Sequence, residues 1–144
     1  MLTNIEFAFN APHRLHAACK IAARRWSHAQ TLVVYCADTS RLTQFDTLLW
    51  SFDDLSFVPH VWAQDPLAAQ TPVLLTTAAL ALPRFDLLLN LDDDCPPFFT
   101  QFKTVLEVVS QDADDREAAR QRWRHYQQAG HAIQRMDLSN QASS

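Results

Sequence analysis

The sequence contains a single glycine, Gly130, among its 144 residues, whereas an average usage of roughly 7% would give about ten. A Walker phosphate loop, a dinucleotide-binding fingerprint and a hydrolase nucleophile elbow each require two or more glycines at fixed spacing. None of these motifs can be formed with Gly130 alone. The usual forms of the commonest nucleotide-binding and acyl-transfer sites are therefore excluded.

Cysteine and positive charge are also scarce. The three cysteines, Cys19, Cys36 and Cys95, form no CxxC pair, which argues against a disulfide framework or a zinc ribbon and fits a reducing cytoplasm. His16 and Cys19 are one helical turn apart, but two ligands do not define a zinc site. We therefore expect no metal and no other cofactor. The net charge of −4 disfavours broad binding to duplex DNA.

Long apolar segments are missing as well. The N-terminus has no basic stretch followed by an apolar run, so it predicts no signal peptide. The longest apolar runs fall far short of the roughly 20 residues of a membrane span. The hydrophobic content is nevertheless 48%, which is enough to form a packed core in one domain of ordinary size.

The hydrophobic pattern alternates between buried strands and amphipathic helices. Strands are predicted at 5–9, 32–36, 73–75 and 87–89, with a short edge strand at 131–135. Helices are predicted at 12–26 with Asn10 as its cap, at 39–49 after Asp38, at 96–109 and at 114–129 before Gly130. This order predicts a three-layer α/β fold, with a mainly parallel central sheet flanked by helices. It is similar to nucleotide-binding folds but has no Gly-rich phosphate loop. We expect one domain over 1–138 and a flexible C-terminal tail over 139–144.

Three consecutive acids, Asp92, Asp93 and Asp94, follow one of the predicted strands. Parallel sheets bind ligands beyond the carboxyl ends of their strands, and Asp38 follows a second strand at the same edge. Clustered carboxylates suit a Mg²⁺-dependent phosphoryl-transfer or nuclease site, which is the alternative function for this sequence. The interpretation that we favour is an exposed loop whose acids cap the helix predicted from Pro96.

The last predicted helix carries the most specific pattern. Its first half is acidic and its second half is basic, an order that complements the helix dipole. Arg116, Arg120, Trp123 and Arg124 are spaced to share one side of this helix. Such a face suits an acidic peptide with an aromatic end, or single-stranded nucleic acid. The interpretation that this helix by itself favours is a solvated face with Trp123 partly in the core.

Aromatic residues are concentrated between the second helix and the third strand. Trp50, Phe52, Phe57 and Trp62 occur within thirteen residues, in an irregular stretch. Such a group is either part of the core or an exposed apolar patch that marks a protein partner.

Several short segments, in this order, resemble the chi subunit family of the bacterial DNA polymerase III holoenzyme from the first strand to about Leu138. They are Phe7-Ala8-Phe9-Asn10-Ala11-Pro12, Val34-Tyr35-Cys36-Ala37-Asp38, Leu48-Leu49-Trp50, Phe57-Val58-Pro59-His60, Asp65-Pro66-Leu67-Ala68, Thr71-Pro72-Val73-Leu74-Leu75, Leu88-Leu89-Asn90-Leu91, Pro96-Pro97-Phe98-Phe99, Arg120-Gln121-Arg122-Trp123-Arg124-His125-Tyr126 and Ala129-Gly130. The resemblance implies an α/β fold and a non-catalytic accessory subunit in DNA replication, located in the cytoplasm.

The resemblance also implies two partners. Trp50 and Phe57 correspond to the positions that bind the psi subunit of the clamp loader, and a helicase is a further candidate partner for that patch. DNA would be reached indirectly, through single-stranded DNA-binding protein.

The second partner is the acidic C-terminal tail of single-stranded DNA-binding protein, which ends in phenylalanine. The resemblance implies that Arg116, Arg120, Trp123 and Arg124 hold this tail. The sequence departs from the family at Trp123, where tyrosine or phenylalanine is usual, and at Gln127, where some relatives carry a basic residue.

Overall fold

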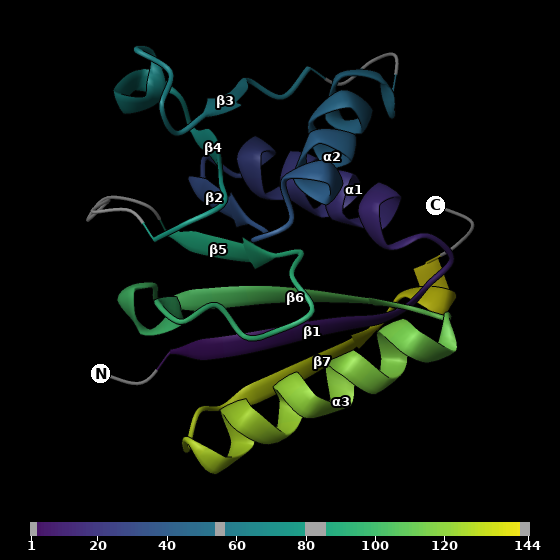
Figure 1. Cartoon of the computed structure of the whole chain (residues 1–144). Coiled ribbons are helices and arrows are strands. Elements are labelled where there is room, and N and C mark those ends of the chain that lie inside the picture. Colours follow the sequence, from purple (N-terminus) through teal and green to yellow (C-terminus); the bar gives the residue numbers. More distant parts are fainter. Residues whose placement is uncertain (1–2, 54–56, 80–85, 142–144) are drawn as a thin grey trace.

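The computed structural model describes residues 3–53, 57–79 and 86–141, which form a parallel seven-stranded sheet with helices on both faces (Figure 1). The strand order is β3-β4-β2-β5-β6-β1-β7. The strands are β1 (Asn4–Ala11), β2 (Leu32–Tyr35), β3 (His60–Trp62), β4 (Val73–Thr76), β5 (Leu87–Asn90), β6 (Thr104–Ser110) and β7 (Ile133–Asp137). The helices are α1 (Arg14–Ser27), α2 (Thr39–Ser51) and α3 (Ala113–Gln128). The predicted α/β class is confirmed.

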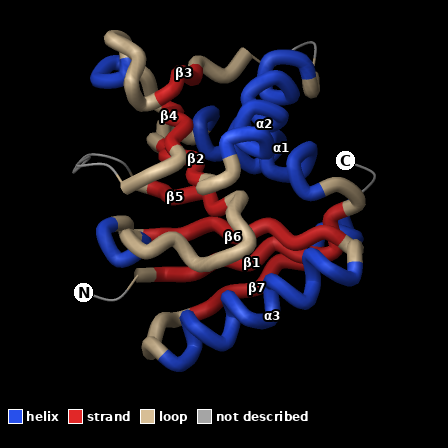
Figure 2. Tube along the Cα trace, viewed as in Figure 1, coloured by secondary structure: helices blue, strands red, loops and turns tan. Residues whose placement is uncertain are grey.

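The sheet separates two hydrophobic layers, and Figure 2 shows its strands lying between the helices. On one face, α1 contributes Ala18, Cys19 and Ala22 to the core, and α2 contributes Leu42, Phe45 and Leu49. On the other face lie α3 and three phenylalanines of the segment before β6, at positions 98, 99 and 102. All residues of β2, β4 and β5 are buried, which is the pattern of parallel strands covered on both faces.

The helix predicted over 96–109 is wrong. A 3-10 turn at Phe99–Gln101 is followed by β6, which lies in the middle of the sheet between β5 and β1. Apolar side chains of β6 are buried on both faces of the sheet, so its pattern imitates the inward face of a helix. Asp92, Asp93 and Asp94, which were expected to cap this helix, therefore have no helix to cap there. The N-cap position of the 3-10 turn is Phe98, which makes no side-chain hydrogen bond.

The start of α1 also differs from the prediction. Asn10 does not cap the helix; it lies in β1 with φ of 64°, where the pairing with β6 shifts register between Ala8 and Ala11. The N-cap position belongs to His13, which makes no capping hydrogen bond through its side chain. The register shift at the end of the strand is followed by a helix that begins at Arg14, two residues after the predicted start.

The other boundaries agree with the expected pattern more closely. Asp38 caps α2 by accepting hydrogen bonds from the backbone N–H of Ser40 and Arg41, and α3 ends before Gly130 as predicted. The stretch from Trp50 to Trp62 is partly regular, because α2 runs through Ser51 and β3 begins at His60. Residues 54–56 lie outside the described part of the chain.

The C-terminal segment continues the fold beyond α3. The predicted edge strand is β7, which pairs with β1. A 3-10 turn at Leu138–Gln141 follows, and the Ser139 hydroxyl donates to Asp137 at 2.6 Å. Of the expected tail, residues 142–144 lie outside the described chain. Within the residues that are described, no helix is long and apolar enough to cross a membrane.

Helices α1 and α3 end in the same left-handed turn. After α3, Gly130 has φ of 86°, and the N–H groups of Gly130 and His131 donate to the carbonyls of Gln127 and Tyr126. After α1, the equivalent left-handed residue is Ala29, with φ of 61°. This is the Schellman arrangement, in which glycine is favoured because a Cβ is strained at positive φ.

Exchanging the residues at these two turns tests the strain directly. Gly130→Ala should lower the free energy of unfolding by about 1 kcal/mol, although the new Cβ would meet no atom within 4 Å. Ala29→Gly should leave stability unchanged or raise it, because relief of strain opposes the added freedom of the unfolded chain. Urea denaturation of both variants measures the difference. Equal destabilisation by the two substitutions would contradict this account.

Candidate interaction surfaces

The outer side of α3 presents the arginine face predicted from the sequence. Arg116, Arg120 and Arg124 are exposed and follow one another at four-residue spacing along the helix. Trp123 lies beside this row and is only partly buried. The structure therefore places all four predicted residues on one side of α3. The three arginine side chains are exposed to solvent, and the Trp123 side chain is partly buried.

Contacts fix two members of the arginine face. The Trp123 ring packs against Phe7 of β1, with ring centroids 5.1 Å apart, so the indole joins the core at one end and reaches the surface at the other. Arg120 forms an exposed ion pair with Glu117, with Nη1 and Oε2 2.9 Å apart. The Arg120 hydrogen bond lowers the pKa of Glu117. Because such exposed pairs are weak, a stronger carboxylate ligand can compete for Arg120.

The inner side of α3 is anchored by a buried ion pair. Arg122 donates from Nε to Glu107 of β6 at 2.9 Å, and neither side chain is more than 1% exposed. The other Glu107 oxygen accepts from the Tyr126 hydroxyl at 2.6 Å and from Asn90 at 2.9 Å. Arg122 also donates to the backbone carbonyl of Asp93 at 3.0 Å. Burial, followed by the charge of Glu107, raises the pKa of Tyr126, which keeps this hydroxyl a hydrogen-bond donor.

This network sets the rotation of α3 about its axis. Ala119, Arg122 and Tyr126 are the buried residues of the helix. With that stripe held against β6 and β1, the arginine face must point outward. The network was not predicted from the sequence, because its acceptor Glu107 lies in the strand that was read as a helix.

The aromatic patch, defined as Trp50 and Phe57, is exposed. Trp50 is 50% exposed and Phe57 is 63% exposed, and their ring centroids are 5.2 Å apart. The Trp50 ring also packs against the ring of His60, with centroids 4.2 Å apart and the ring planes tilted by 41°. The exposure of two adjacent aromatic rings to water is unfavourable for an isolated chain. It is typical of a protein-binding surface.

A hydrogen-bonded histidine supports the aromatic patch from below. His60 is buried, and its ring nitrogens lie 2.7 Å from the Val58 carbonyl and 2.9 Å from Asp46 Oδ1. The other oxygen of Asp46, on α2, accepts from the indole N–H of Trp62 at 3.3 Å. These hydrogen bonds join α2 to β3. In the sequence, the residue that could have indicated this contact is His60, at the end of the Phe57–His60 segment.

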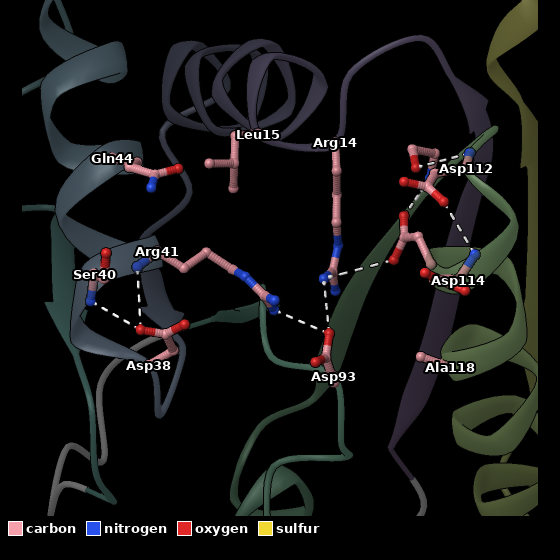
Figure 3. A pocket seen from close by; sticks show the side chains of 12 residues that line it. Arg14, Leu15, Asp38, Ser40, Arg41, Gln44, Asp93, Asp112, Asp114 and Ala118 are labelled. Atoms are coloured by element: carbon pink, nitrogen blue, oxygen red, sulfur yellow. Dashed lines mark hydrogen bonds and ion pairs between the residues drawn. The ribbon is translucent and has the colours of Figure 1, made fainter.

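The carboxyl edge of the sheet holds the acids considered for a magnesium site (Figure 3). Asp93 lies between two arginines: Arg41 Nη1 is 3.0 Å from Asp93 Oδ1, and Arg14 Nη1 is 3.9 Å from it. The hydrogen bond from Arg41 lowers the pKa of Asp93. Asp38 lines the same pocket, but its carboxylate caps α2.

Three further acids at this edge accept hydrogen bonds from the backbone. Asp92 Oδ1 accepts from the Ala37 N–H at 3.3 Å, Asp112 caps α3, and Asp115 accepts from the Ser110 N–H at 2.6 Å. Within the described ranges, no group of three His, Cys, Asp or Glu side chains is arranged to hold a metal ion. The geometry is thus that of carboxylates occupying helix N-termini, where a nucleotide-binding fold would place phosphates.

Removing one member of the buried pair should destabilise the whole domain. Arg122→Met leaves the Glu107 carboxylate without its cation in the core, which should lower the free energy of unfolding by about 3–5 kcal/mol. Adding Glu107→Gln should restore part of that loss, because the uncompensated charge is removed. Chemical denaturation measures both, with Arg120→Met as the exposed control of nearly unchanged stability. Strictly additive losses in the double variant would contradict the assigned pairing.

The sequence matches known proteins over most of its length. A family model described as "DNA polymerase III chi subunit, HolC" matches residues 2–134. The DNA polymerase III subunit chi of Pseudomonas aeruginosa is 34% identical over 121 residues, covering 84% of each chain. Its Escherichia coli counterpart is 30% identical over 113 residues, covering 78% of this chain and 77% of the relative. The chain belongs to the DNA polymerase III chi subunit family.

Proposed function

We propose that this protein is a non-catalytic adaptor of the DNA polymerase III holoenzyme in the cytoplasm. One surface binds the acidic C-terminal tail of single-stranded DNA-binding protein, and another binds the psi subunit of the clamp loader. The observation that carries the proposal is the arginine face of α3, where three exposed guanidinium groups flank a partly buried indole. The resemblance to chi subunits supplies the identity of the partners.

The arginine face has the chemistry that such a tail requires. Guanidinium groups form forked hydrogen bonds with carboxylates, including a terminal carboxylate. Trp123 provides an aromatic surface for the terminal phenyl ring. A small contact of this kind reaches micromolar affinity, about −8 kcal/mol, and weakens as salt screens the charges. The overall charge of −4 does not oppose it, because only the local surface must be basic.

The aromatic patch is a separate surface for psi. It lies where α2 ends and β3 begins, and β3 is at the opposite edge of the sheet from β7 (Figure 1). Helix α3 packs on β6, on the far half of the sheet. Two partners can thus bind at the same time. A helicase that used the aromatic patch would compete with psi and leave the arginine face free.

The central arginine of α3 should decide tail binding. Arg120→Ala should weaken binding of an acidic peptide that ends in phenylalanine by at least about tenfold, because the middle donor of the row is lost. Fluorescence anisotropy measures this, and Lys103→Ala removes an exposed positive charge from the segment before β6, outside α3, as a control. Unchanged binding in Arg120→Ala would refute the assignment.

The aromatic patch should contribute to psi binding and not to tail binding. Phe57→Ala should weaken the complex with psi by more than about tenfold, as expected for an aromatic residue at the centre of an interface, and should spare tail binding. Met136→Ala, an exposed apolar residue on β7, is the control for general loss of apolar surface. Loss of both partners in Phe57→Ala, with the fold intact by circular dichroism, would show that the two surfaces are not separate.

A further inference from the structure

Helix α1 carries a concentration of positive charge that the proposed function does not use. It contains Arg14, Lys20, Arg24 and Arg25 and no acidic residue, although the chain as a whole has a net charge of −4. Arg14 is engaged at the carboxyl edge of the sheet. The other three line a groove on the face of the sheet opposite to α3.

The groove runs between α1 and the edge strand β7 and has a volume of about 730 Å³. It exists because α1 packs on β6, β2 and α2 and leaves the sheet surface near β7 open. The residues of α1 that line it recur at helical spacing on one side of the helix; they are His16, Ala17, Lys20, Ile21, Arg24 and Arg25.

The cations of the groove are largely free to meet a ligand. Arg25 pairs with Glu6 of β1 at 2.6 Å. Lys20 and Arg24 are exposed, and neither has a carboxylate partner among the described residues. The other acid at the groove, Glu107, is committed to Arg122. Arg135 of β7 also lines the groove, is exposed and has no carboxylate partner among the described residues. In the described part of the chain, the rim therefore carries three positive charges without an acidic partner.

The floor of the groove is apolar. Ala8 and Leu106 form its base, Ile21 and Leu138 are only partly buried in the adjoining core, and Met136 is 42% exposed. The outer edge of β7 is the end of the sheet, and its central residues, 134–136, are exposed. An unpaired strand edge offers backbone donors and acceptors to an extended chain.

We propose that this groove binds an extended acidic protein segment, with apolar side chains on the floor and carboxylates paired with Lys20 and Arg24. Charge complementarity selects an acidic ligand, and the apolar floor with the open strand edge selects a polypeptide. Single-stranded nucleic acid fits less well, because it binds by stacking bases on aromatic rings. Among the described residues of the lining, Phe7 is the one Phe, Tyr or Trp, and its ring packs against Trp123 and Tyr126 on the α3 side; the other rings are the imidazoles of His13, His16 and His28.

A peptide of four Asp-Leu repeats, acetylated and amidated at its ends, tests the proposal with the full-length ¹⁵N-labelled protein. The amide end removes the terminal carboxylate proposed for the α3 site, so the two sites are distinguished. Amide shifts are expected in α1 and β7. Lys20→Glu with Arg24→Glu should weaken binding at least about tenfold. Arg116→Glu with Arg124→Glu changes the net charge equally on the other face and should change binding less than about twofold.

Four results would overturn the proposal: shifts confined to α3, equal weakening by both double variants, no binding at low salt, or peptide-induced dimers in sedimentation. Tighter binding of oligothymidylate than of the peptide at the same amides would assign the groove to nucleic acid instead. The spectrum of each variant verifies its fold. Shifts confined to α3 would overturn this proposal while supporting the arginine face as an acidic-peptide site. Loss of groove binding alone leaves the surfaces proposed for psi and for the tail unaffected, so the two accounts fail separately.

Discussion

The Glu107 carboxylate lies in the middle of a parallel sheet, where an unpaired charge would cost several kcal/mol. Arg122 neutralises it, while Tyr126 and Asn90 complete its hydrogen bonds. These four residues come from three elements, β5, β6 and α3, so the network joins the last helix to the centre of the sheet. Because a buried ion pair tolerates little displacement, it also specifies which side of α3 faces solvent. The orientation of the arginine face therefore depends on the buried Arg122.

The scarcity of glycine has a structural counterpart at the carboxyl edge of the sheet. Nucleotide-binding folds have glycine in their strand-to-helix turns, so that no side chain blocks a phosphate from the helix N-terminus. Here Asp38 and Asp112 cap α2 and α3, and Asp93 is held between Arg14 and Arg41. The chain's own carboxylates therefore occupy the anion positions. The fold is retained, while the surfaces proposed for recognition lie on helices and strands away from this edge.

Sequence reasoning succeeded where periodicity distinguishes the elements and failed where it does not. Helix α3, its arginine face and the strands β2, β4 and β5 have clear patterns and appear as predicted. Strand β6 was misread because both of its faces are buried, and its β-branched residues Val105, Val108 and Val109 were the signal against a helix. Arg122 could not be told from Arg120 or Arg124 by residue type. Its role depends on Glu107, and that pairing spans two elements and appears only in three dimensions.

We propose an adaptor whose arginine face and aromatic patch are occupied by their partners at the same time. Isothermal titration of an acidic, phenylalanine-ended peptide into the free protein and into its preformed complex with psi tests it most directly. We predict the same affinity in both titrations, within about twofold, because the arginine face of α3 and the aromatic patch lie over different parts of the sheet. Displacement of psi by the peptide, or loss of peptide binding in the complex, would contradict the account.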